Sequence, residues 1–352
     1  MNRISSITFL AALAASGFAA AAPAYTTPVG YTTETVAGKA SVGSPDSFSL
    51  ISLTLQSASL RNGSVTSLTS TTLRDTGANF DTLLSAGKEY VLRVTSGTQR
   101  GAIIAISTWG TASGNNSTDV VTGQNLVGTG IAVGDTFEIR PAATLSSLFG
   151  ATNTAGLKSG TLSSADVIWI PTGGGNFEKY YYSPGSSFPV TVAAGWKNSS
   201  GGDASNAAII YTDAIFIQRR DTTNLQLLVS GEVIKSSTQI LIEGNSSRNL
   251  YNYVSSVFPV GTTLGNSGLQ SSLLAGTLSS ADIVWVPTGP GTYNKFYYSP
   301  GATFPVNVVA GWKDANGNDA TNQVLTSGLI IQRRGTTNIT VSLTPPAGYG
   351  DL

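Results

Sequence analysis

Two aspartates, Asp166 and Asp282, recur at the start of one short apolar motif, which reads DVIWIP in one place and DIVWVP in the other. An arginine pair follows each of them later in the chain, at 219–220 and 333–334. Because neighbouring residues of a strand point to opposite faces, one arginine of each pair can turn inward and bind the aspartate. The pattern therefore predicts two structural ion pairs.

Few other groups in the chain are suited to catalysis. There is no histidine and no cysteine, which excludes imidazole bases, thiol nucleophiles and the usual zinc sites. A paired-carboxylate hydrolase needs two acids about 5–10 Å apart, and the acids that recur with the two aspartates are Asp203 and Asp319. We therefore predict no catalytic residue, no cofactor and no enzymatic activity. A glycan-active hydrolase is the least favoured alternative.

One loop has the spacing of a weak calcium site. Its oxygen-bearing side chains are Asp314, Asn316, Asn318 and Asp319, with a glycine between the two asparagines. Calcium binds six or more oxygens at such spacing, but the matching loop at 198–203 has one carboxylate fewer and no bidentate glutamate follows. A hairpin loop that uses Asn/Gly turn chemistry is the favoured interpretation, and no other metal site is predicted.

A set of aromatic residues also recurs and could form a binding surface. Its members are Trp169, Tyr181, Trp196, Trp285, Tyr297 and Trp312. Exposed aromatics stack on sugar rings or seal protein interfaces. Core packing is the favoured interpretation, because Tyr180 in one copy is Phe296 in the other, so the hydroxyl is dispensable there.

All of these residues belong to a stretch that occurs twice. Residues 160–198 and 276–314 align without a gap, and 26 of the 39 positions are identical. The match continues into IFIQRR and LIIQRR, which end at residues 220 and 334. A repeat of this quality is a structural unit used twice.

Within each copy, short apolar runs alternate with Gly, Asn, Ser and Pro, which is typical of strands joined by hairpin loops. The fold class is therefore predicted as all-β, with two homologous β-sandwich or barrel modules. In the first module nearly ninety extra residues separate ISLTL from ATLSSLFG. Their alternating patterns predict an inserted small antiparallel β-barrel of five or six strands. Short helical turns are expected within 74–87, starting near Asp75 or Asn79, and within 143–160 and 262–276.

The predicted domain order begins with a signal peptide. The segments are a signal peptide (1–24), an arm with the first part of module A (25–57), the inserted barrel (58–142), the rest of module A (143–230), module B (231–346) and a C-terminal tail (347–352). We expect residues 29–36 of the arm to pair within the same chain. A strand donated to a neighbouring subunit is the alternative.

Charge and the leader indicate where the protein works. Lys and Arg together number 19, as do Asp and Glu, so no basic excess is present and nucleic acid is not an expected partner. Residues 1–24 have the positive start, apolar middle and small-residue end of a secretory leader. No later stretch is apolar enough to predict a transmembrane segment. The expected location is outside the cytoplasm: the cell exterior, the cell surface or the periplasm.

Three segments carry a resemblance to a known group of proteins. They are TTPVGYTT at 26–33, EYVLRVTSGTQRGAIIAI at 89–106 and GDTFEIRPAATLSSLFG at 134–150. With them, essentially the whole mature chain resembles an uncharacterised paralogous family of secreted β-rich proteins from Verrucomicrobia-type bacteria. The resemblance implies secretion and supplies no activity, substrate or site residue.

The favoured functional hypothesis is a secreted, non-enzymatic structural or cell-surface protein, capable of self-assembly. The alternative is a carbohydrate-binding or adhesive module that uses its surface aromatics. The partners expected under these hypotheses are other copies of the chain, other cell-surface components, or glycans.

Overall fold

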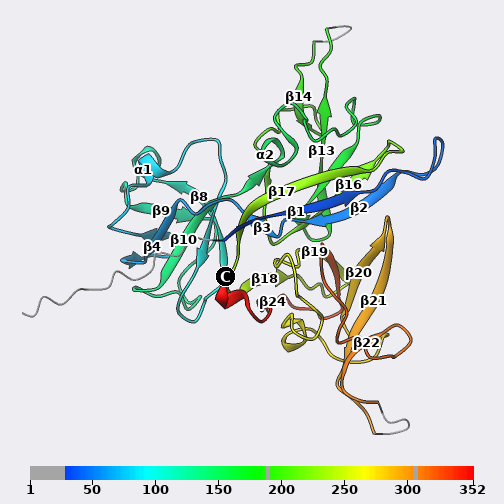
Figure 1. Ribbon diagram of the computed structural model, residues 1–352. Coiled ribbons are helices and arrows are strands. Elements are labelled where there is room, and N and C mark those ends of the chain that lie inside the picture. Colours follow the sequence, from blue (N-terminus) through cyan, green and yellow to red (C-terminus); the bar gives the residue numbers. More distant parts are fainter. Residues whose placement is uncertain (1–27, 188–190, 304–307) are drawn as a thin grey trace, which may run out of the picture.

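The computed structural model describes residues 28–187, 191–303 and 308–352. The predicted signal peptide lies outside the described residues. Strands dominate (Figure 1), and the all-β prediction is confirmed.

Module A is a sandwich of two sheets. Its five-stranded sheet has the order β14 (Gly195–Asn198), β13 (Asn176–Ser183), β12 (Val167–Gly173), β16 (Ala214–Arg219) and β2 (Ser47–Ser52). Its smaller sheet has the order β1 (Val29–Val36), β17 (Leu225–Val233) and β3 (Leu55–Gln56). A short ladder joins β11 (Ala143–Thr144) to β15 (Ala208–Ile209). β1 crosses the front of the module beside β17 (Figure 1).

Module B repeats the five-stranded order. The corresponding strands are β22 (Gly311–Asp314), β21 (Thr292–Ser299), β20 (Ile283–Gly289), β23 (Leu329–Arg333) and β19 (Leu250–Val254). Its second sheet pairs β18 (Thr238–Ile242) with β24 (Ile339–Leu343). The register also corresponds, since Trp169 lies opposite Lys179 and Trp285 lies opposite Lys295.

The predicted insert forms a seven-stranded antiparallel sheet, rather than one of five or six strands. Its order is β4 (Arg61–Ser64), β10 (Thr136–Pro141), β7 (Tyr90–Val94), β8 (Ile103–Trp109), β9 (Asp119–Thr122), β6 (Thr72–Arg74) and β5 (Ser67–Leu68). The two outermost strands, β4 and β5, are consecutive in the chain and separated by two residues. The sheet therefore curls back on itself around its own apolar core.

Helices in the described part of the chain are few and short. They are α1 (Phe80–Leu83), α2 (Leu145–Phe149) and the 3-10 turns η1 (Thr111–Ser113), η2 (Leu269–Ser271) and η3 (Tyr349–Asp351). The predicted start of α1 is confirmed, because Asn79 caps it through a side chain that accepts from the Asp81 N–H. The turns expected within 143–160 and 262–276 are α2 and η2.

The arm pairs within the same chain, as predicted, and β1 matches β17 over its whole length from Val29 to Val36. β17 runs on to Val233, so it crosses the position where module B was predicted to begin. The buried apolar side chains of both modules form one continuous core. The barrel has a separate core.

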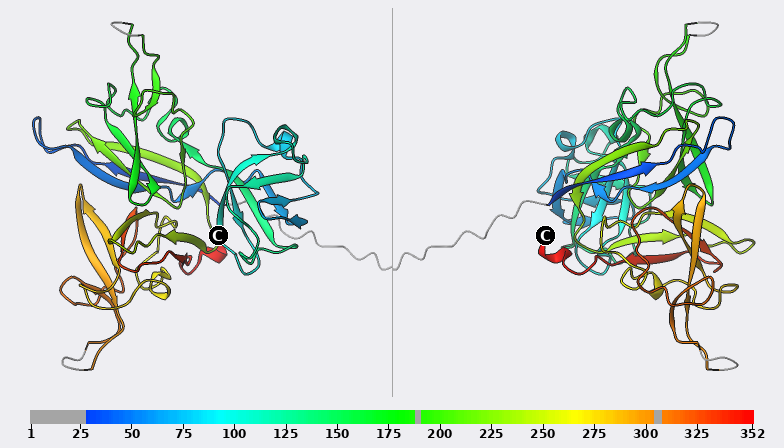
Figure 2. Two further views of the ribbon diagram at one scale, coloured as in Figure 1. Left: turned by 180° about the vertical axis from the view of Figure 1, so that it is seen from behind. Right: turned by 45° about the vertical axis from the view of Figure 1, so that its right-hand side comes forward.

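The modules also meet through the outer faces of their five-stranded sheets. Leu50, Ala214 and Ile330 are buried together there. Gly328 allows this close approach, because a Cβ at that position would lie 2.5 Å from the Ala214 Cβ. The two modules extend in opposite directions, one upward and one downward in both views of Figure 2.

Candidate functional site

The two recurring aspartates form the predicted ion pairs. Asp166 binds the Arg219 guanidinium, and both side chains are buried. Its carboxylate also accepts from the backbone N–H of Lys158 and of Arg220, each at 2.7 Å. Asp203, the second acid of the hydrolase alternative, accepts from Ser205 instead.

Module B has the same arrangement. Asp282 binds the Arg333 guanidinium and accepts from the backbone N–H of Leu274 and Arg334. A guanidinium and two backbone donors hold each of these carboxylates in a fixed position. This geometry fits a structural clamp between β20 and β23 better than proton transfer.

The loop of the calcium candidate is organised by hydrogen bonds within itself. The Asp314 carboxylate accepts from the backbone N–H of Asn316 and Asn318, each at 2.8 Å, and from the Asn318 side-chain nitrogen at 3.0 Å. The hydrogen bonds from Asn318 and the loop backbone hold the Asp314 pKa below its usual range. Asp319 accepts from Thr321.

The matching loop of module A forms the same turn with a neutral residue. Asn198 Oδ1 accepts from the backbone N–H of Ser200 and Gly202. Asn318 turns its side-chain nitrogen, rather than its oxygen, toward the Asp314 carboxylate. The side-chain oxygens of the two residues therefore do not converge on one point. In the described part of the chain, no group of three or more acidic side chains gathers where it could hold a metal ion.

Two of the six aromatic candidates do not lie on a surface. Trp196 is 0% exposed and Trp312 is 2% exposed, so neither can stack on a ligand. The register explains this burial: Tyr182 lies opposite Trp196, and both side chains point to the core face of the sheet. Trp196 also donates through Nε1 to the Gly150 carbonyl at 2.9 Å.

The other four candidates lie half-buried on the outer faces of the two sheets. Lys179 places its ammonium 4.0 Å from the Trp169 ring centroid, and Lys295 lies 4.3 Å from that of Trp285. Tyr181 and Tyr297 follow two residues after these lysines, so they share the same outer faces. In module A, Phe48 packs edge-on against Trp169.

Around Trp285 the outer face of module B is hollowed into an open groove of about 520 Å³. Its lining includes Trp285, Lys295, Tyr297, Gln332 and Arg334, and no acidic residue lines it. The structure therefore brings Trp285 and Tyr297 together, beside two cationic side chains.

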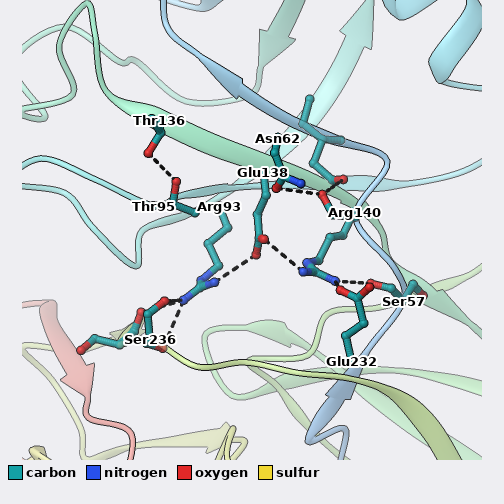
Figure 3. A network of polar contacts seen from close by, with 12 residues as sticks. Ser57, Asn62, Arg93, Thr95, Thr136, Glu138, Arg140, Glu232 and Ser236 are labelled. Carbon is teal, nitrogen blue, oxygen red and sulfur yellow. Dashed lines mark hydrogen bonds and ion pairs between the residues drawn. The ribbon is translucent and has the colours of Figure 1, made fainter. Parts of the chain in front are cut away.

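A buried charge network that sequence reasoning missed lies where the barrel meets both modules (Figure 3). Glu138 on β10 binds Arg93 on β7 and Arg140 on its own strand, each at 3.0 Å. Arg140 continues to Glu232 on β17. Arg93 donates to the backbone carbonyls of Ser236 and Ser237, just before β18.

The two arginines of this network favour the ionised form of Glu138. Burial alone would raise the Glu138 pKa, but the hydrogen bonds and charges of Arg140 and Arg93 outweigh it, so the Glu138 pKa is lowered. The network contains two cations and two anions, and its role is to join three parts of the fold. The available sequence signal was that Arg93 and Glu138 share a face of neighbouring strands in a chain with few charges.

Two further carboxyl groups have no ionic partner among the described residues. Burial raises the pKa of Glu34 and that of Asp213 to about 7 in each case. Asp213 lines a cavity of about 210 Å³ between the modules, and among the described residues only Thr212 donates to its side chain, at 3.5 Å.

Searches of protein-family models, of curated proteins and of solved structures found no match to this chain. In the part of the chain that the structure describes, no helix has both the length and the apolar character to cross a membrane.

Proposed function

We propose that this protein is a secreted, non-enzymatic structural or cell-surface protein that self-assembles. The observation that carries the proposal is a pair of corresponding hairpins at opposite ends of the molecule. The β13–β14 hairpin extends from the top of Figure 1 and the β21–β22 hairpin from the bottom, and Figure 2 shows the same separation.

The described stems of these hairpins suit contact with another protein. Neither the segment 183–195 nor the segment 299–311 contains a charged residue. Val192 and Val308 are each 37% exposed, and Val309 is 72% exposed. In each stem an antiparallel bridge joins the two sides of the hairpin into a narrow ribbon. The bridges are Ser186 to Val192 and Ala302 to Val308. Exposed apolar groups on an uncharged ribbon favour association, and two ribbons at opposite ends permit extended assembly.

The ion pairs support a structural role as well. In each module the recurring aspartate serves to join neighbouring strands, and the barrel charges serve to join three parts of the fold. Asp166, Asp282 and Glu138 are buried and paired with arginines, so they are not placed to exchange protons with a substrate.

The test is the size of the mature chain, residues 25–352, in solution. We expect light scattering after size exclusion to show oligomers that grow with concentration, and negative-stain microscopy to show extended particles. Val309→Glu should reduce assembly because it places a charge on the apolar stem. Val42→Glu is the matched control, since Val42 is 89% exposed on the β1–β2 connection. A strict monomer at high concentration, with no retention on cells, would contradict the proposal.

Glycan binding is a second candidate function, and the module B groove is the observation that favours it. Trp285 and Tyr297 supply the apolar lining that a pyranose ring requires, and Gln332 and Arg334 supply hydrogen-bond donors. Module A serves as an internal comparison, because it has the same four residue types at Trp169, Tyr181, Gln218 and Arg220.

A further inference from the structure

The two modules differ in what their outer-face donors bind. In module A, Asp46 Oδ2 accepts from Gln218 Nε2 at 2.6 Å and from Arg220 Nε at 3.2 Å. Gln218 is oriented by Trp169, whose Nε1 donates to its Oε1 at 3.0 Å. An amide and a guanidinium thus hold one carboxylate beside a tryptophan.

Module B builds the same donor pair. Trp285 Nε1 donates to Gln332 Oε1 at 3.3 Å. This hydrogen bond orients the Gln332 amide as the Trp169 hydrogen bond orients Gln218 in module A. Arg334 donates through Nη1 to the carbonyls of Leu278 and Ala281, as Arg220 does to Leu162 and Ala165. The donors are therefore held in place by the same supporting contacts.

The carboxylate of module A has no counterpart in module B. Ser47 lies opposite Arg219, so Asp46 takes the position opposite Arg220. Leu250 lies opposite Arg333, so Asn249 occupies the position opposite Arg334. Asn249 is exposed. Gln332 Nε2 and Arg334 Nε consequently have no hydrogen-bond partner among the described residues. Gln332 is only 8% exposed, yet it lines the groove.

Charge points to the kind of ligand that these donors would take. Lys295 and Arg334 are the charged residues of the groove lining, and both are cationic. A carboxylate that accepts from a guanidinium and an amide forms strong, charge-assisted hydrogen bonds. The aromatic side chains beside these donors suit a sugar ring more than an extended peptide, whose backbone would need a free strand edge.

We propose that the module B groove binds a carboxylate-bearing sugar, such as a uronic acid residue of an acidic glycan. Gln332 and Arg334 hold the carboxylate where Asp46 sits in module A, and Trp285 and Tyr297 contact the ring. This inference rests on glycan binding as the function of the groove.

The test is calorimetric titration of the mature chain with trigalacturonate and with its neutral methyl ester. We expect the acid to bind and the ester to bind about 10-fold or more weakly, as for loss of charge-assisted hydrogen bonds. Asn249→Asp places the module A carboxylate beside Arg334 and should abolish binding of the acid. Asn249→Gln keeps the position neutral and should bind normally, as should Arg220→Gln in module A. Because position 249 is exposed, the two Asn249 variants should melt at the wild-type temperature.

The possible outcomes separate the two hypotheses. Equal binding of acid and ester, or an unaffected Asn249→Asp variant, would overturn carboxylate recognition and leave glycan binding standing. Failure of both ligands to bind would overturn both. Displacement of trigalacturonate by tetraglutamate at equal concentration would assign the groove to acidic peptides and overturn the sugar proposal.

Discussion

Glu34 is an acidic residue that points inward from an edge strand. Its neighbours on that face of β1 are Thr32 and Val36, and Val36 is fully buried in the main core. Burial raises the Glu34 pKa to about 7. In the unfolded chain the group titrates near its ordinary value, so folding favours the protonated form.

This pKa shift predicts how stability depends on pH. A carboxyl whose folded pKa is raised contributes fully below its unfolded pKa and loses that contribution as pH rises to about 7. We expect the free energy of unfolding to fall between about pH 4.5 and 7. Glu34→Gln should flatten that fall and stabilise the protein at pH 7 by about 1–2 kcal/mol, after allowance for partial solvent access. Urea unfolding at several pH values measures this.

Glu89→Gln is the control for that measurement, because Glu89 is exposed. Asp213→Asn should act like Glu34→Gln, since burial raises its pKa in the same direction. A Glu34→Gln variant with the wild-type pH profile would show that this carboxyl is solvated in the folded state.

Alternation along strands predicted which residues pair, but not which side of a sheet is the core. Arg219 and Arg333 face inward to the aspartates as expected. From the sequence alone, Trp196 and Trp312 could face either side of their sheets. They are buried because they lie opposite Tyr182 and Tyr298, whose side chains point to the core. Such cross-strand partners come from pairing that a single sequence does not state.

At the scale of elements, the charge network joins β7, β10, β17 and the segment before β18. Glu138 is 7% exposed and lies between two arginines that are 5% and 8% exposed. Removing its charge would leave Arg93 without a carboxylate and Arg140 with only Glu232. Breaking a buried ion pair on one side costs about 3–5 kcal/mol, because a buried charge is left uncompensated.

We therefore expect Glu138→Gln to lower the free energy of unfolding by about 3–5 kcal/mol. Amide exchange should quicken at Gln239, whose N–H donates to the Gly101 carbonyl across the same junction. Asp46→Asn is the matched control: it breaks a half-exposed pair with Arg220 and should cost about 1 kcal/mol or less. Equal losses for the two variants would mean that the junction charges are solvated.

The strands that the sequence pattern located are those with apolar alternation, such as β7 and β10. β4 reads RNGS and β5 reads SL, so neither carries the pattern of a half-buried strand. They form because hydrogen bonds with β10 and β6 complete the sheet. This tertiary origin explains why five or six strands were predicted where seven are present.

At the scale of the whole molecule, the packing of one module on the other was not predictable from the sequence. The outer faces of their sheets carry aromatics such as Phe177, Phe216 and Tyr253, which contact one another across the modules. In the sequence these residues look the same as a ligand-binding surface. Only the placement of the modules separates those that are covered from Trp285 and Tyr297, which line a groove.

Ion pairs and hydrogen bonds join the barrel to the modules, and the barrel has its own apolar core. Its entry and exit strands pair directly, with Arg61 opposite Ile139, so the two ends of segment 58–142 lie close together. Inserted domains with adjacent ends and a separate core fold independently. We expect the excised segment to be soluble and to show one cooperative thermal transition by circular dichroism.

The complementary chain, with residues 57 and 143 joined by a short linker, should also be soluble and folded. It should melt at a lower temperature than the full chain, because Glu232 loses Arg140 and the Gln239 N–H loses the Gly101 carbonyl. The full chain with Glu138→Gln should show two thermal transitions, one for the barrel and one for the modules, because the substitution weakens the junction between them. These transitions can be compared with those of the two separate pieces. A barrel that melts without cooperativity, or a two-module chain that aggregates, would show that the barrel and module A fold as one unit.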